Sequence, residues 1–118
     1  MAGTFYRLGE RSASLQASTG PDTWLRPFET RGSSLYKKPD LCEAHGLSVY
    51  QSWEEVSRAR DIVPWMARKS VAAVTVTEDD GVMRHTPTPE GDSHHDWWTN
   101  PLGLIPAAIV VEAHREGF

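Results

Sequence analysis

The segment GLSVYQSWEEV, residues 46–56, decides the fold because it combines the pattern of a strand with the start signal of a helix. Leu47 and Val49 alternate with polar or amphipathic neighbours, so they share one face of a strand. Ser52, followed three residues later by Glu55, matches the capping box, in which two side chains satisfy free amides at a helix start. The segment therefore predicts a strand that leads directly into a helix beginning at Ser52.

The chain after this segment predicts where the helix ends. Trp53 and Val56 fall along one helical face, as expected for a helix that packs against a core. Pro64 cannot continue the helix, because it has no amide hydrogen and its ring clashes with the preceding turn. We therefore expect the helix to end near Asp61 or Ile62 and a second short turn to occupy residues 64–68.

Further stretches predict the remainder of a sheet. Residues 71–78 alternate most clearly, and residues 4–8 and 107–114 show a similar strand pattern. The Asp-Asp-Gly at residues 79–81 predicts a hairpin turn, because glycine tolerates the positive φ that such a turn requires. Residues 82–86 are therefore expected to form a strand antiparallel to residues 71–78. The predicted fold is α+β: a mainly antiparallel twisted sheet of about five strands, with one or two short helices and long loops.

Two long segments carry few regular patterns. Residues 10–40 are rich in Ser, Thr, Gly and Pro, yet aromatic side chains such as Trp24 and Phe28 interrupt them, so we expect irregular structure folded over the core. Residues 86–100 contain two prolines, a glycine and a polar run before two tryptophans. This stretch predicts an ordered functional loop, because loops held on a scaffold commonly carry binding residues.

The composition predicts a single domain over residues 1–118. Lys and Arg number 12 against 16 Asp and Glu, for a formal net charge of −4 with neutral histidines. The lone Cys42 excludes an internal disulfide framework and a cysteine-rich zinc module, and it suits a reducing compartment. No apolar run of signal-peptide or membrane-span type is found, so we expect a cytoplasmic protein without membrane contact. Scattered charges argue against nucleic-acid binding, which needs a clustered basic face.

His94 and His95 form the densest group of chemically versatile side chains, with Asp92 and Asp96 beside them. Imidazole and carboxylate groups can ligate zinc or iron, but no H-x-x-x-H helix or cysteine pair supports a metal, so no metal ligand is assigned. Either histidine could instead act as a general acid or base, since imidazole titrates near neutral pH and an aspartate could orient it. The structural alternative is that both histidines bond to backbone or water.

Trp97 and Trp98 follow directly and offer a planar surface for a ligand. Tryptophan joins a large apolar body to one N–H donor, so one ring could stack on a base, a nicotinamide or a sugar while the other fills the core. The alternative is that both rings are structural.

Three features together resemble the small ADP-ribosyltransferase-like fold, including its RES-type bacterial relatives: Tyr6-Arg7 on an early strand, the GLSVY strand leading into a helix, and a late strand carrying Glu112. Residues 46–98 also resemble small bacterial proteins that pair a GLSVY strand with a later His-aromatic-Trp stretch. The resemblance implies that NAD is a substrate.

The same resemblance implies roles for individual residues. Arg7 corresponds to an arginine that contacts the NAD pyrophosphate, and Glu112 to a glutamate that stabilises the ribosyl cation. Ser48 or Tyr50 corresponds to a residue that shapes the nicotinamide pocket. Val110 stands where a second acidic residue is expected, which departs from the family pattern. An arginine and a carboxylate suit cleavage of a glycosidic C–N bond, but these two can act together only if their strands are neighbours.

Two functional hypotheses follow. The first is a small ligand-binding or catalytic domain for a nucleotide-like or other planar substrate, with ADP-ribosyl transfer or glycosidic C–N cleavage as its reaction. The second is a noncatalytic interaction protein, of accessory or immunity type, that binds a protein partner through residues 87–100 and exposed tryptophan. A concave pocket joining the arginine, tyrosine and histidines favours the first, and a flat apolar patch at the two tryptophans favours the second. The candidate residues are His94, His95 and Glu112 for catalysis, and Arg7, Ser48, Tyr50, Trp97 and Trp98 for substrate binding.

Overall fold

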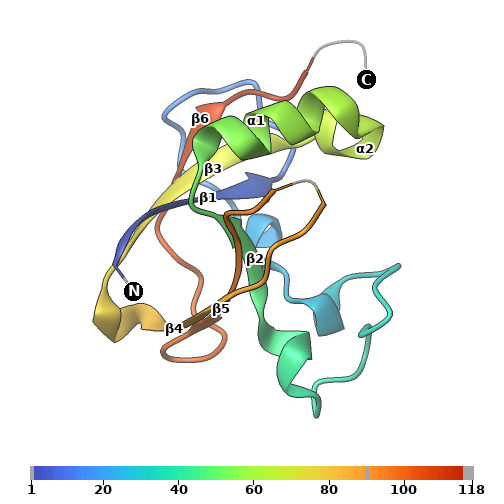
Figure 1. The fold of residues 1–118 in the computed structure, drawn as a ribbon, viewed down its shortest axis with the longest axis vertical. Coiled ribbons are helices and arrows are strands. Elements are labelled where there is room, and N and C mark those ends of the chain that lie inside the picture. Colours follow the sequence, from blue (N-terminus) through green and yellow to red (C-terminus); the bar gives the residue numbers. More distant parts are fainter. Residues whose placement is uncertain (1, 90, 116–118) are drawn as a thin grey trace.

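An antiparallel sheet organises the computed structural model, which describes residues 2–89 and 91–115 (Figure 1). Within these ranges six strands form one sheet in the order β4-β5-β2-β1-β3-β6. The predicted α+β class is confirmed, with a sheet that dominates the fold. The strands are β1 (Gly3–Gly9), β2 (Leu47–Tyr50), β3 (Ser70–Val76), β4 (Gly81–His85), β5 (His94–Thr99) and β6 (Ile109–Glu112).

Two α-helices in the described ranges, α1 (Trp53–Ile62) and α2 (Pro64–Ala67), follow β2 and lie together at one end of the sheet (Figure 1). The predicted helix start is confirmed, because the Ser52 hydroxyl accepts a hydrogen bond from the Glu55 amide at 3.2 Å. The predicted break is confirmed as well, because α1 ends at Ile62 and Pro64 begins α2 after the single residue Val63. Short-range sequence signals therefore determine the secondary structure of residues 52–67.

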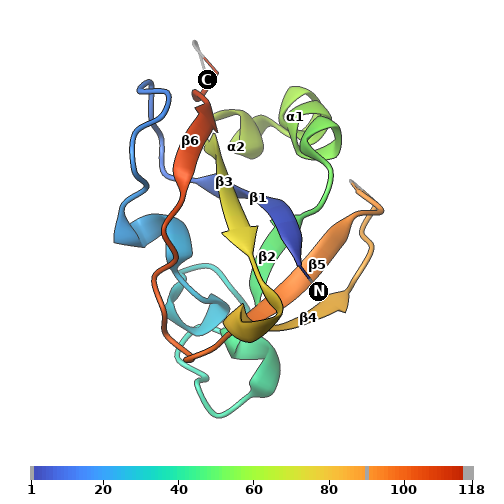
Figure 2. The same ribbon diagram turned by 90° about the vertical axis from the view of Figure 1, so that its left-hand side faces the viewer.

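The main hydrophobic core lies on the face of the sheet that the N-terminal third of the chain covers. Residues 10–46 contain three short 3-10 helices, at Pro21–Trp24, Pro27–Glu29 and Cys42–His45, and Figure 2 shows this part of the chain along one side of the sheet. Their Trp24 is fully buried, which confirms irregular structure folded over the core. The core residues are Phe5, Trp24, Leu47, Val49, Ala72, Val74, Val76, Trp97 and Ala108.

The predicted hairpin at residues 79–81 is wrong. A short 3-10 helix, Glu78–Asp80, leads the chain from β3 to β4, which pairs with β5 and not with β3. Gly81 adopts a φ of 131°, and a Cβ atom there would lie 2.0 Å from the carbonyl oxygen of Trp98. The glycine is therefore required by the close approach of β4 to β5, and the pairing partner depends on the path of the whole chain.

The predicted loop over residues 86–100 is also wrong in part, because its second half forms β5 between β2 and β4. His95 and Trp97 face the core on one side of β5, where His95 contacts the ring of Phe5. His94 faces the other side, where it contacts the ring of Tyr50. A histidine at a core-facing position conceals the apolar alternation that identifies a strand.

Candidate functional site

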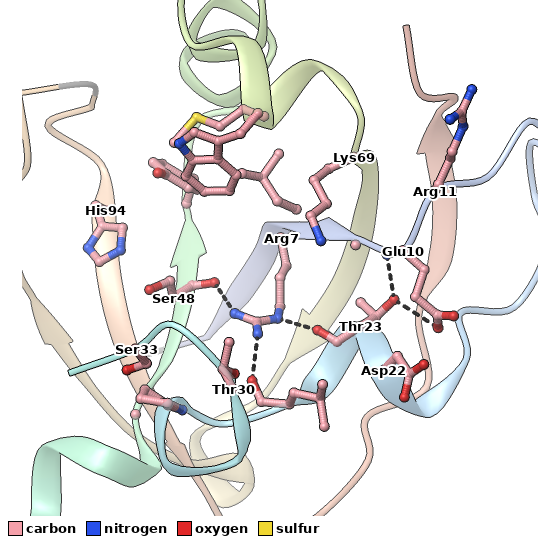
Figure 3. Close-up of a pocket in the computed structure, with 18 of the residues that line it drawn as sticks. Arg7, Glu10, Arg11, Asp22, Thr23, Thr30, Ser33, Ser48, Lys69 and His94 are labelled. Carbon is pink, nitrogen blue, oxygen red and sulfur yellow. Dashed lines mark hydrogen bonds between the residues drawn. The ribbon is translucent and has the colours of Figure 1, made fainter. Parts of the chain in front are cut away.

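A cavity opens where β1 and β2 separate. The two strands pair at Tyr6 and Tyr50, whereas β1 pairs with β3 along its whole length. Beyond that point a cavity of about 960 Å³ lies between β1, β2, α2 and the 3-10 helix at Pro21–Trp24 (Figure 3). The predicted site residues that line it are Arg7, Ser48, Tyr50 and His94.

Arg7 crosses the gap between the two strands and is held by backbone carbonyl oxygens (Figure 3). Its Nε donates to the Thr23 oxygen at 2.6 Å, its Nη1 to the Ser48 oxygen at 2.8 Å, and its Nη2 to the Leu25 oxygen at 3.1 Å. The guanidinium also lies 5.6 Å from the ring centroid of Trp24. The cation therefore has a fixed position, because it joins β1 to β2 and to the irregular N-terminal segment.

The charge of Arg7 has no carboxylate partner among the described residues. Burial lowers the pKa of Arg7 to about 10, and the nearby cation Arg26 adds to this shift. The guanidinium remains protonated at neutral pH but has lost part of its hydration. Such a charge is stabilised further by an anion, because the attraction between unlike charges strengthens as hydration is lost.

Other charged side chains surround this cation. Lys69 and Arg11 line the same cavity, as do the carboxylates of Glu10 and Asp22 (Figure 3). Glu10 is already engaged, since its carboxylate accepts a hydrogen bond from the Thr23 hydroxyl at 3.4 Å. The cavity therefore offers positive charge for an anionic group together with acceptors for hydroxyl or amine groups.

An apolar wall completes the cavity beside these charges. Tyr50 is buried, whereas Trp65 on α2 is 57% exposed, and both line the cavity with Met66 and Leu8. Aromatic rings of this kind can stack on a planar group of a ligand. The arrangement places an aromatic surface and a fixed cation in one concave site.

Neighbouring His94 and His95 have different environments. His94 lines the cavity, and its Nδ1 lies 2.8 Å from the carbonyl oxygen of Thr86. His95 is buried on the core face, where its Nδ1 lies 2.7 Å from the Ser93 oxygen and its ring lies 5.0 Å from that of His85. Only His94 of this pair reaches the cavity, because successive side chains of a strand point to opposite faces.

Glu112 lies away from the cavity. It is on β6, which β3 separates from β1, so the condition that the strands of Arg7 and Glu112 be neighbours is not met. The carboxylate of Glu112 accepts hydrogen bonds from Trp53 Nε1 at 2.7 Å, from Ser57 Oγ at 3.2 Å and from Arg60 Nη1 at 2.5 Å. These contacts attach α1 to the edge of the sheet.

The two tryptophans of β5 also have structural contacts. Trp97 is 1% exposed, donates from Nε1 to the Asp80 oxygen at 3.1 Å and meets Trp24 edge to face. Trp98 is partly buried, and its Nε1 donates to the Cys42 oxygen at 2.9 Å. Neither ring lines the cavity, and Trp97 fills the core as expected for one of the two rings.

Trp65 and Lys69 are among the cavity residues that the sequence analysis did not propose as site residues, as are Glu10, Arg11 and Asp22. Trp65 and Lys69 lie on and just after α2, which the turn at Pro64 directs toward β1. An exposed tryptophan beside a proline turn is a weak signal that could have drawn attention to Trp65. No sequence signal distinguishes Lys69, because its position at the cavity depends on how α2 packs.

Glu55 holds the start of β5 and thereby the position of His94. Its carboxylate accepts hydrogen bonds from the amides of Asp92 at 3.1 Å and Ser93 at 2.8 Å, in place of the amide of Ser52 expected for a capping box. The pKa of Glu55 is lowered, and the largest cause is a hydrogen bond with the Ser93 side chain. Burial raises the pKa in opposition, and the hydrogen bonds from the amides of Ser93 and Asp92 lower it further. The folded state therefore favours the charged carboxylate.

Glu55→Gln is expected to lower the free energy of unfolding by about 1–2 kcal/mol at pH 7, because the charged acceptor of two amides is lost. A carboxylate with a lowered pKa stabilises the fold above the pKa of the unfolded carboxyl, and this effect disappears as the pH falls through the folded value. Urea denaturation at pH 7 and pH 3 should therefore show a difference from wild type that shrinks in acid. The exposed neighbour supplies the control Glu54→Gln, and an equal difference at both pH values would contradict the assignment.

Among the described residues no three His, Cys, Asp or Glu side chains are grouped as a metal site. No helix in the described part of the chain is long and apolar enough to cross a membrane. No protein-family model, curated protein or solved structure matches the chain, so the site is interpreted from its own geometry.

Proposed function

We propose that the cavity binds a small anionic ligand that carries a planar ring, such as a nucleotide. The observation that carries this proposal is Arg7, a protonated guanidinium without a carboxylate partner among the described residues, in the same cavity as Trp65 and Tyr50. The cavity of about 960 Å³ lies within the range of roughly 300–1,000 Å³ typical of small-molecule sites.

The phosphate of such a ligand would lie against Arg7. Each of the three guanidinium nitrogens donates one hydrogen bond to a backbone oxygen. Because each Nη carries two hydrogens, Nη1 and Nη2 each have a second N–H for a phosphate oxygen. Lys69 lines the same cavity and adds a second cation for the phosphate.

The planar ring of the ligand would lie against Trp65 and Tyr50, since both contribute aromatic surface to the cavity. NAD belongs to this ligand class, and ADP-ribosyl transfer or glycosidic C–N cleavage remains the reaction that the resemblance implies. The carboxylate for that reaction would come from Glu10 or Asp22, because these line the cavity and Glu112 does not.

Adenosine monophosphate (AMP) is expected to bind more tightly than adenosine, and Lys69→Gln is expected to weaken AMP binding about fivefold by removing one exposed charge. Isothermal titration calorimetry measures both affinities. The control is Lys38→Gln, which removes an exposed lysine that does not line the cavity. Equal binding of adenosine and AMP, or an equal loss in both variants, would contradict the proposal.

A protein-interaction surface is the second candidate function. Trp97 and Trp98 do not form the flat apolar patch that would favour this hypothesis, because the first ring is in the core and the second is partly buried and hydrogen-bonded. The observation that favours this candidate is instead the exposure of Ile62 at 71% and Trp65 at 57% at the α1–α2 junction. A protein partner seated there would compete with the ligand for Trp65.

A further inference from the structure

His94 is a buried polar side chain that the proposed binding of phosphate and ring does not use. It is 7% exposed, lies on β5 and lines the cavity. Its ring meets Tyr50 edge to face, with 5.1 Å between ring centroids and 78° between planes. Packing therefore fixes the plane of the imidazole.

The contacts of His94 also determine which ring nitrogen carries the proton. Nδ1 lies 2.8 Å from the carbonyl oxygen of Thr86 and 2.9 Å from its hydroxyl. A carbonyl oxygen can only accept a hydrogen bond, so Nδ1 must be the donor. In the neutral ring Nε2 then holds an unshared electron pair. In the part of the chain that the structure describes, Nδ1 makes hydrogen bonds and Nε2 makes none.

The residues that share a face of the sheet with His94 include polar side chains. The register of β2 against β5 places Tyr50 opposite His94 and Ser48 opposite Asp96, so all four side chains belong to one face of the sheet. Figure 3 shows His94 and Ser48 on the same side of Arg7. Because Arg7 and His94 line the same cavity, a ligand with its phosphate at Arg7 that fills the cavity would extend toward His94.

We infer that His94 is the proton acceptor of this cavity: its Nε2 accepts a hydrogen bond from a hydroxyl group of the bound ligand or of water, and accepts the proton when that group reacts. This inference rests on the proposed function. In the transfer step the O–H bond breaks, its electron pair stays on oxygen, and a new N–H bond forms at Nε2. The Nδ1–H bond to Thr86 remains in the imidazolium, so the ring keeps its position while its charge changes.

The substrate class that follows is a phosphorylated compound with a free hydroxyl group, as in a nucleoside phosphate. Inorganic phosphate offers the anion for Arg7 but has neither the ring nor the ribose hydroxyl groups of a nucleotide. AMP provides the phosphate, the ring and two ribose hydroxyls. Binding of inorganic phosphate therefore reports on the anion site at Arg7 alone, whereas binding of AMP also reports on the contact with His94.

The test begins with wild-type protein and nitrogen-15 NMR of the imidazole rings. We expect a protonated Nδ1 and an unprotonated Nε2 in free His94, and a shift of the Nε2 signal when AMP is added. His95, on the opposite face of β5, is the internal control and should not respond. A His94 ring protonated at Nε2 alone, or an Nε2 signal that AMP leaves unchanged, would overturn the inference.

A variant gives the second readout. His94→Asn keeps an amide donor for Thr86 but removes the acceptor at Nε2, so AMP affinity should fall about tenfold while phosphate affinity stays the same. Equal AMP affinity in variant and wild type would overturn the inference and leave the proposed function intact. Failure of wild-type protein to bind either AMP or phosphate would overturn both.

Discussion

Glu112→Ala is expected to lower the free energy of unfolding by about 3 kcal/mol, because it leaves the Arg60 guanidinium buried without a counter-charge. The Arg60 side chain is 0% exposed and donates to Glu112 at 2.5 Å and to the backbone oxygen of Ala113. Burial lowers the pKa of Arg60, and the charge of Glu112 opposes that shift. Urea denaturation monitored by circular dichroism measures the loss.

The matched control removes both charges. The double variant Arg60→Met with Glu112→Leu should recover most of the lost stability, since apolar side chains of similar volume commonly replace a buried ion pair without cost. Folded Glu112→Ala should bind AMP as wild type does, because Glu112 lies outside the cavity. A stability loss below about 1 kcal/mol, or a large loss of AMP affinity, would contradict the structural role.

Trp97→Ala is expected to cost about 3–5 kcal/mol, which is a large part of the stability of a domain of this size. The substitution removes a fully buried indole that packs on Trp24 and one of the two N–H donors to the Asp80 carbonyl, which keeps its bond from the Asn100 amide. Trp98→Ala should cost clearly less, because part of that ring is exposed to solvent before the change.

Thermal and urea denaturation of both tryptophan variants tests this difference. If Trp97 belonged to an exposed binding patch, its removal would leave stability nearly unchanged and weaken binding of a partner. A cost of less than about 1 kcal/mol for Trp97→Ala would therefore contradict its place in the core. Comparing the two variants also distinguishes the structural roles of the adjacent tryptophans, which the sequence alone does not distinguish.

The strand and helix over residues 46–62 could be predicted because their signals are local. Alternation places Leu47 and Val49 in the core, Ser52 caps the helix, and Pro64 ends it. Each signal acts within a few residues and does not depend on which strands become neighbours.

The position of β5 could not be predicted in the same way. Its core face carries His95, Trp97 and Thr99, so two of three inward side chains are polar and the pattern indicates a loop. These polar groups are stabilised by contacts with distant parts of the chain, such as the hydrogen bond between the Thr99 hydroxyl and Arg26. The predicted hairpin failed for a related reason, because pairing of β4 depends on where β5 lies.

Half of the predicted site residues meet at the cavity. Arg7, Ser48, Tyr50 and His94 come together because β1 and β2 diverge beyond Tyr6, which no local pattern reveals. Of the other predicted residues, His95 and Trp97 are buried on the core face of β5, Glu112 contacts α1, and Trp98 lies near the far end of β5 from His94, where it donates to the Cys42 oxygen. Candidate site residues could be chosen from the sequence because they are charged or aromatic. Which of these candidates share a site depends on the order of the strands in the sheet.

The most direct test of the central claim is the NMR signal of the Arg7 Nε–H group during titration with AMP. This hydrogen is bonded to the Thr23 oxygen, and the guanidinium that carries it faces the cavity. We predict that the Arg7 signal shifts with AMP and with inorganic phosphate, while the signal of Arg60, which is paired with Glu112 outside the cavity, stays in place. An Arg7 signal that remains unchanged at saturating AMP, or an equal shift of both arginines, would contradict an anion site at Arg7.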